Sequence, residues 1–275
     1  MSYIIDNSSL TSDHPEGIAV ENRMLFLRRT AKNLLAKILF SLRLYPHIFF
    51  TFMPFKIHEF RELLKGTKLA RSDKILDLGC GGGLQSLILA GRCESIVGID
   101  VDSAAIARAR RNAAMVRGRI SAEFHCARLE DAGFKAQSFD KIFSFCVLEH
   151  IANYAEVLHE AHRILKTGGW FIFSVDSLES ITEKAALEKH QREHSVVKYF
   201  RPGELEALLQ AIGFRKIQIY PLFSSRFAQK LFLRGLNQQF KFGRLRALLD
   251  YFFLAFVEKY HPGDKGIFFA IKCCK

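Results

Sequence analysis

The stretch KILDLGCGGG, residues 74–83, decides how this chain folds. Three apolar residues and one acid predict a short buried strand, and four glycines follow within five positions. The apolar run over residues 84–90 then predicts a helix. Glycine lets a backbone come close to a ligand, and a helix N-terminus presents free N–H groups. The strand, turn and helix together therefore predict a nucleotide-binding crevice.

A second strand is predicted over residues 95–100, and it ends in Asp100. A carboxylate at this place can accept hydrogen bonds from both hydroxyls of a ribose. The alternative is a cap on the next helix, but Asp102 and Ser103 already offer that role. We therefore expect Asp100 to bind the ribose of an adenosine.

Four segments, taken in this order, resemble class I S-adenosylmethionine-dependent methyltransferases of the small-molecule type. Residues 77–83 read D-x-G-x-G-x-G, whereas a dinucleotide fingerprint would need a glycine where Leu84 stands. The other three are the strand over 138–150 that ends in Glu-His, the Leu-Lys-Thr-Gly-Gly of 165–169, and residues 200–214. The resemblance covers residues 72–221 and leaves both flanks undescribed.

The resemblance implies a Rossmann-like α/β fold with a doubly wound seven-stranded sheet, mostly parallel with an antiparallel last strand. The alternation of predicted strands and helices favours the same arrangement. We add a helical N-terminal extension and a helical insertion before the last strand. The expected division is a poorly ordered N-terminus (1–20), a helical basic and aromatic extension (21–72), the methyltransferase domain (73–221 and 266–275) and a helical insertion (222–265).

The resemblance also implies the cofactor, S-adenosyl-L-methionine, and its contacts. In the family's pattern Asp77 orients the loop and the cofactor's ammonium group, and Val101 packs on the adenine. Arg128 stands where an acid often binds the adenine amino group, and arginine cannot accept that hydrogen bond. Either the backbone of Arg128 and Leu129 or the side chain of Glu130 serves instead. The expected cofactor contacts are Asp77, Gly79, Cys80, Gly81, Gly83, Asp100, Val101, Arg128, Leu129 and Phe145.

Two histidines are the candidates for the acceptor side of the site. His150 follows the fourth strand, and its imidazole can take a proton from a hydroxyl near neutral pH. The alternative is that His150 only shapes the pocket. His194 matches a histidine that lies near the substrate in similar methyltransferases. Residues 190–194 also spell H-x-x-E-H, but no third ligand is evident, so we expect no metal site.

The charge of +12 is concentrated in the two flanks. Residues 1–72 carry 11 basic and 6 acidic residues, residues 73–221 carry 19 of each, and residues 222–275 carry 10 and 3. Of the 26 phenylalanines, 17 also lie in these flanks. A basic and aromatic surface suits an anionic membrane, so residues 21–55 and 222–257 are the candidate contacts. The alternative is that these segments only cap the active site.

Three functions follow from these patterns. The first is methyl transfer to a small-molecule or lipid- or glycan-linked acceptor, on oxygen, at a membrane surface. The second is methylation of RNA or protein, although we do not expect a nucleic-acid partner. The third is a cofactor-binding regulatory module without turnover. Six cysteines without a framework spacing and an N-terminus unlike a secretory signal predict a cytoplasmic protein that can also bind the membrane.

Overall fold

A computed structural model describes residues 53–114 and 120–275 of the chain. The poorly ordered segment expected over residues 1–20 lies outside the described residues. Residues 21–52 of the expected helical extension also lie outside them, and with them nearly all of the proposed membrane contact 21–55.

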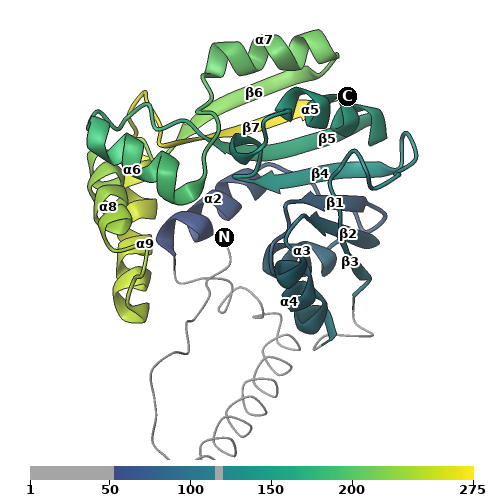
Figure 1. Cartoon of the computed structure of the whole chain (residues 1–275), viewed down its shortest axis with the longest axis horizontal. Coiled ribbons are helices and arrows are strands. Elements are labelled where there is room, and N and C mark those ends of the chain that lie inside the picture. Colours follow the sequence, from purple (N-terminus) through teal and green to yellow (C-terminus); the bar gives the residue numbers. More distant parts are fainter. Residues whose placement is uncertain (1–52, 115–119) are drawn as a thin grey trace, which may run out of the picture.

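One sheet of seven strands forms the centre of the molecule (Figure 1). The strands are β1 (Lys74–Leu78), β2 (Ser95–Asp100), β3 (Ala122–Cys126), β4 (Phe139–Phe145), β5 (Leu165–Asp176), β6 (Arg215–Leu222) and β7 (Phe268–Cys274). Their order is β3-β2-β1-β4-β5-β7-β6, and β7 runs antiparallel to both of its neighbours. The pairs β1–β2, β1–β4, β2–β3 and β4–β5 are parallel. The predicted fold class is confirmed.

Helices cover both faces of the sheet (Figure 1). They are α2 (Pro54–Leu64), α3 (Leu84–Ala90), α4 (Ser103–Ala114), α5 (Tyr154–Ile164), α6 (Lys184–His194), α7 (Pro202–Ile212), α8 (Arg226–Asn237) and α9 (Arg244–Tyr260). Figure 1 shows α5 and α7 on one face and α2, α3 and α4 on the other. The insertion between β6 and β7 contains α8 and α9, which share a buried cluster with α2.

Burial explains why these segments adopt these structures. In β5, Phe171, Ile172 and Phe173 are fully buried, because helices cover both faces of a parallel sheet. In α5, Val157 and Ala161 lie four residues apart on the side that meets the sheet. Each fully buried valine, isoleucine or phenylalanine side chain stabilises the fold by about 1.5–3 kcal/mol.

Helix α2 is joined to the sheet and to the insertion although it precedes the first strand. Its Arg61 donates a hydrogen bond to the Tyr251 hydroxyl of α9. The Tyr220 hydroxyl of β6 donates to the Glu62 carbonyl over 3.1 Å. Phe55 is fully buried, and its ring meets two phenylalanine rings at centroid distances of 4.9 and 5.9 Å. Helix α2 is therefore a fixed part of the domain.

Candidate active site

The loop over residues 79–83 joins β1 to α3, and its backbone requires glycine at three places. Gly79, Gly81 and Gly83 have φ values of +73°, +52° and +74°. A Cβ at Gly79 would lie 2.3 Å from Val147, and one at Gly83 would lie 2.8 Å from Phe124. A Cβ at Gly81 would meet nothing within 4 Å among the described residues. Packing thus requires two of the glycines, while open space lies beside the third.

Hydrogen bonds tie this loop to the end of β2. The backbone N–H of Cys80 donates to the Ile99 carbonyl over 3.0 Å. The N–H of Gly81 donates to Asp100 Oδ2 over 2.8 Å, and Asp100 Oδ1 accepts from the N–H of Asp102 over 2.9 Å. The carboxylate of Asp100 therefore lies directly beside the glycine loop, at the place expected for a ribose-binding acid.

Asp77 is fully buried at the end of β1. The Ser86 hydroxyl donates to its Oδ2, while Oδ1 has no hydrogen-bond partner among the described residues. Burial raises the pKa of Asp77 to about 7. Burial likewise raises the pKa of the neighbouring Cys80 thiol, which packs into the core. The unpartnered oxygen leaves Asp77 free to accept one further hydrogen bond.

The segment that follows β3 lies beside the end of β2. The N–H of Ala127 donates to the Asp100 carbonyl over 3.1 Å. Val101 leaves 69% of its surface exposed, which is unusual for a large apolar side chain beside a polar site. Arg128 is exposed and Leu129 is buried. These residues form one side of the space beside the loop, and an adenine on Val101 would cover its exposed surface.

Phe145 ends β4 with its ring in the core. The ring stacks on Phe143 at 6.1 Å and lies at an angle to Phe60 of α2 at 5.5 Å. Any contact between Phe145 and a cofactor would therefore come mainly from its backbone.

The two candidate histidines lie on neighbouring segments. His150 ends the short 3₁₀ helix η1 (Leu148–His150), is exposed, and its Nδ1 lies 3.4 Å from the Ser195 carbonyl. His194, at the end of α6, is half-buried, and its ring stacks on His190 at 4.5 Å. Burial lowers the pKa of His194. The structure thus brings both histidines close to Ser195.

Sequence reasoning missed a group of buried acids at the ends of β4 and β5. We call Glu59, Glu149 and Asp176 the carboxyl cluster; their exposed fractions are 0%, 0% and 4%. Cys146 Sγ and carboxylate oxygens of Glu149 and Asp176 lie within 4.8 Å of one another. Both carboxylate oxygens of Glu149 lack a hydrogen-bond partner in the described part of the chain. Such an arrangement can hold a proton or a cation.

Helix α2 supplies one acid and one base to this region. Lys56 Nζ lies 3.0 Å from Glu59 Oε2. Glu59 Oε1 lies 3.0 Å from Cys146 Sγ and accepts a hydrogen bond from the Ser174 hydroxyl of β5. Burial alone would lower the pKa of Lys56, but its interactions with Cys146, Glu59 and Glu149 raise it overall. Lys56 is therefore a permanent positive charge beside the cluster.

Burial shifts Glu149 and Asp176 toward their protonated forms. Burial, then the charge of Asp176, raises the pKa of Glu149 well above its usual range. Burial raises the pKa of Asp176 to about 7, although Lys56 acts in the opposite direction. His190 Nε2 lies 3.6 Å from Asp176 Oδ2, and burial lowers the pKa of His190 to about 3. Asp176 thus titrates near neutral pH beside a neutral histidine.

Two sequence signals could have revealed this cluster. Glu59 lies four residues after Phe55 and four before Leu63, so it falls on the buried face of an amphipathic helix. Asp176 ends a strand that pairs with β4, so it belongs at the same edge of the sheet as Cys146. An acid on a buried face or at a strand's carboxyl end is a candidate for function.

The site can now be compared with known proteins. The sequence profile of the family described as "Methyltransferase domain" matches residues 76–173. A ubiquinone biosynthesis O-methyltransferase of Hydrogenovibrio crunogenus is 27% identical over 168 residues, which cover 58% of this chain and 69% of that relative. This chain carries a class I S-adenosylmethionine-dependent methyltransferase domain. The chain spans 61–69% of the length of the curated relatives that it matches.

Solved structures share the fold of this methyltransferase at low identity. A phosphoethanolamine N-methyltransferase of Haemonchus contortus, solved with S-adenosylhomocysteine, has a TM-score of 0.60 at 18% identity, covering 78% of this chain and 51% of that one. A geranyl diphosphate C-methyltransferase of Streptomyces coelicolor has 0.61 at 14%, covering 80% and 79%. Because these enzymes methylate nitrogen and carbon, the fold alone does not define the accepting atom.

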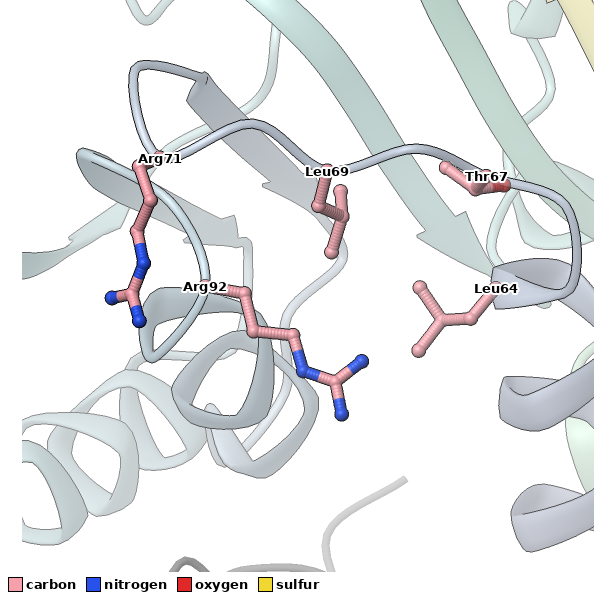
Figure 2. Close-up of a pocket in the computed structure, with 5 residues that line it drawn as sticks. All are labelled: Leu64, Thr67, Leu69, Arg71 and Arg92. Carbon is pink, nitrogen blue, oxygen red and sulfur yellow. The ribbon is translucent and has the colours of Figure 1, made fainter.

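Two cavities in the described part of the chain lie away from the glycine loop. One of about 300 Å³ is lined by Leu64, Thr67, Leu69, Arg71 and Arg92, near the amino ends of β1 and β2 (Figure 2). The other, of about 460 Å³, lies between α4 and β3. Neither is lined by a residue expected to bind the cofactor.

Proposed function

We propose that this methyltransferase moves a methyl group to a hydroxyl oxygen of a small aromatic, lipid-linked acceptor at a membrane surface. The observation that carries the proposal is the position of the carboxyl cluster, at the ends of β4 and β5, beside the glycine loop at the end of β1. Groups that hold a proton suit a hydroxyl acceptor, whose proton must leave during transfer. The names of the curated relatives, ubiquinone biosynthesis O-methyltransferases, support an oxygen acceptor of this chemistry.

The cofactor contacts are part of this proposal. Asp100 takes the ribose hydroxyls, Val101 packs on the adenine, and Asp77 orients the ammonium group of the methionine portion. The open space beside Gly81 and the unpartnered oxygen of Asp77 support these roles. The proposed contacts are Asp77, Gly79, Cys80, Gly81, Gly83, Asp100, Val101, Arg128, Leu129 and Phe145. His194 contacts the acceptor, and His150 is the sequence-based candidate for a general base.

Helix α9 supports the membrane part of the proposal. Its inner side is packed through Ala247, Tyr251 and Leu254. Its outer side exposes half or more of each of six large apolar side chains, Leu248, Leu249, Phe252, Phe253, Phe256 and Tyr260. No helix in the described part of the chain is long and apolar enough to cross a bilayer. An apolar face in a basic segment suits insertion into an anionic membrane surface instead.

Vesicle sedimentation tests the membrane part. With vesicles of phosphatidylcholine and phosphatidylglycerol, Phe252→Ser combined with Phe256→Ser should weaken binding roughly a hundredfold. The matched control is Val197→Ser, which removes another exposed apolar side chain, 54% exposed, and should bind like the wild type. Equal binding by all three proteins would refute the membrane proposal.

Methyl-labelled S-adenosylmethionine tests the acceptor. The chain is offered catechol, catechol carrying a prenyl group in mixed vesicles, total RNA and a protein extract. We expect a labelled methyl ether of the prenylated catechol, with less label on free catechol. Label on RNA or protein would refute the acceptor, and the absence of label from every fraction would favour a module without turnover.

A further inference from the structure

We propose that Glu149 and Asp176 form the carboxyl pair that takes the acceptor's hydroxyl proton, and that Lys56 and Glu59 of α2 position this pair. The inference rests on the O-methylation proposed above and assigns its proton-accepting group.

The environment of the Glu149 side chain indicates a protonated carboxyl group or a bound ligand. Its side chain is fully buried, and neither carboxylate oxygen has a hydrogen-bond partner among the described residues. Burying an unpartnered carboxyl group is costly, so it is tolerated where the group is protonated or meets a ligand. Glu149 follows β4 by four residues, next to the strand that carries the glycine loop. An acceptor hydroxyl beside the loop would give Glu149 its missing partner.

Asp176 lies close to Glu149. An oxygen of Asp176 lies within 4.8 Å of one of Glu149 and of Cys146 Sγ. Two carboxyl groups at this separation resist simultaneous ionisation, so the pair retains a proton where isolated acids would have none. Burial raises the pKa of Glu149 well above its usual range and that of Asp176 to about 7, so this pair binds protons more readily than isolated carboxyl groups do.

Helix α2 brings an acid and a base to this carboxyl pair. Glu59 connects Cys146 and Ser174, which belong to the ends of β4 and β5, and Lys56 binds Glu59 over 3.0 Å. The hydrogen bonds of α2 to β6 and α9 hold this helix over the sheet. Helix α2 lies outside the matched residues 76–173, so it adds its own charges to a shared domain.

The proposed step balances. The acceptor's O–H bond breaks, and its proton goes to the ionised oxygen of the pair. The oxygen's electron pair forms the bond to the methyl carbon while the carbon–sulfur bond breaks, and that electron pair stays on sulfur. The pair then returns the transferred proton to water. The charged and titratable groups that face Asp176 are Lys56 and Glu59 from α2, Cys146 after β4, Glu149 from η1, His190 from α6 and Tyr199.

The first test uses Glu149→Gln and Asp176→Asn with prenylated catechol. Each should lower kcat by about a hundredfold or more, since a general base contributes at least this factor. Affinity for S-adenosylhomocysteine, measured by calorimetry, should stay at the wild-type value and shows that the variants fold. The matched control is Glu188→Gln on the exposed side of α6, which should turn over like the wild type.

The second test is the pH dependence of kcat in variants of Glu59 and Lys56. If these residues had a purely structural role, the two substitutions would not shift the pH profile in opposite directions. Glu59 raises the pKa of Asp176 and Lys56 lowers it. Glu59→Gln should therefore shift the acid limb to lower pH, and Lys56→Met should shift it to higher pH, each by about one unit. Limbs that stay at the wild-type pH in both variants would refute the positioning role.

The remaining outcomes separate the two proposals. An inactive wild type would refute the O-methylation and this inference with it, whereas an active Glu149→Gln variant would refute this inference alone. Loss of activity in His150→Ala together with full activity in Asp176→Asn would assign the base to His150. Wild-type activity that disappears on dialysis against a chelator and returns with Mg²⁺ would show that the carboxyl cluster holds a cation.

Discussion

The backbone N–H of Gly81 donates a 2.8 Å hydrogen bond to the carboxylate of Asp100. The residue expected to bind the ribose therefore also holds the glycine loop in place. The same carboxylate accepts the N–H of Asp102 at 2.9 Å, at the start of α4. The cofactor's two expected supports, the loop and the acid, form one unit.

Removing this acid should abolish tight cofactor binding. If Asp100 binds the two ribose hydroxyls as proposed, Asp100→Ala removes charge-assisted hydrogen bonds, and its affinity for S-adenosylhomocysteine should fall by about a hundredfold in calorimetry. Asp102→Ala is the control, because Asp102 accepts the N–H of Ala104 and forms an ion pair with Arg108 over 3.8 Å, both within α4. Unchanged affinity in Asp100→Ala would show that the ribose binds elsewhere.

Two of the loop glycines, Gly81 and Gly83, should respond differently to alanine. In Gly81→Ala the new Cβ meets open space, so only the positive φ is unfavourable and the free energy of unfolding should fall by about 1 kcal/mol. The affinity for the cofactor should fall as well, because the methyl group occupies the space beside the loop. In Gly83→Ala the Cβ also collides with Phe124 and Ala109, so the loss of stability should reach about 3 kcal/mol.

Gly91→Ala is the control for the glycine series. Gly91 has a φ of −70°, and a Cβ there would lie 3.7 Å from its nearest neighbour. Denaturant unfolding and calorimetry measure stability and affinity. If Gly81→Ala bound the cofactor as tightly as Gly91→Ala, the space beside Gly81 would not be the cofactor's place.

Asp77 should make stability depend on pH. Its pKa is about 7 in the folded chain and about 3.9 when unfolded, so between these values the folded state binds more protons. The contribution of Asp77 to stability is therefore fully present below about pH 4 and is lost as the pH rises through 7. Asp77→Asn removes this loss, so its free energy of unfolding relative to the wild type should increase by about 3 kcal/mol between pH 5 and pH 8. If the difference in the free energy of unfolding between Asp77→Asn and the wild type stayed constant with pH, the raised pKa of Asp77 would be contradicted.

The link between Arg61 and Tyr251 should control the mobility of α2. Tyr251→Phe removes the hydroxyl that accepts from Arg61, so amide hydrogen exchange in Pro54–Leu64 should become faster. Tyr260→Phe is the control, because Tyr260 is 56% exposed on the outer side of α9. Equal exchange in both variants would show that the packing of Phe55 alone holds α2.

The fold and the cofactor loop could be predicted because their signals are local. The glycine run after a buried strand, Asp100 at the end of the next strand and the apolar spacing of α5 are each contained within a few residues. The boundary between α5 and β5 carries no such signal, because α5 ends at Ile164 and β5 begins at the next residue, Leu165. Gly168, with a φ of +79°, lies inside that strand although glycine is typical of a turn.

The carboxyl cluster could not be predicted because it depends on contacts between distant segments. Glu59 and Ser174 are 115 positions apart, and only the docking of α2 on β5 brings them together. Helix α6 was also missed, because its one buried residue, His190, leaves no apolar stripe to recognise. Sequence reasoning therefore selected His150, which is exposed, and passed over the buried acids beside it.

A crystal structure of the chain with S-adenosylhomocysteine tests the central claim most directly. We expect the ribose hydroxyls to bind the carboxylate of Asp100 and the adenine to pack on Val101. The sulfur should lie beside residues 79–83 and face the carboxyl cluster. The compound bound in the cavity beside Arg71 and Arg92, or on any surface away from Asp100, would contradict it.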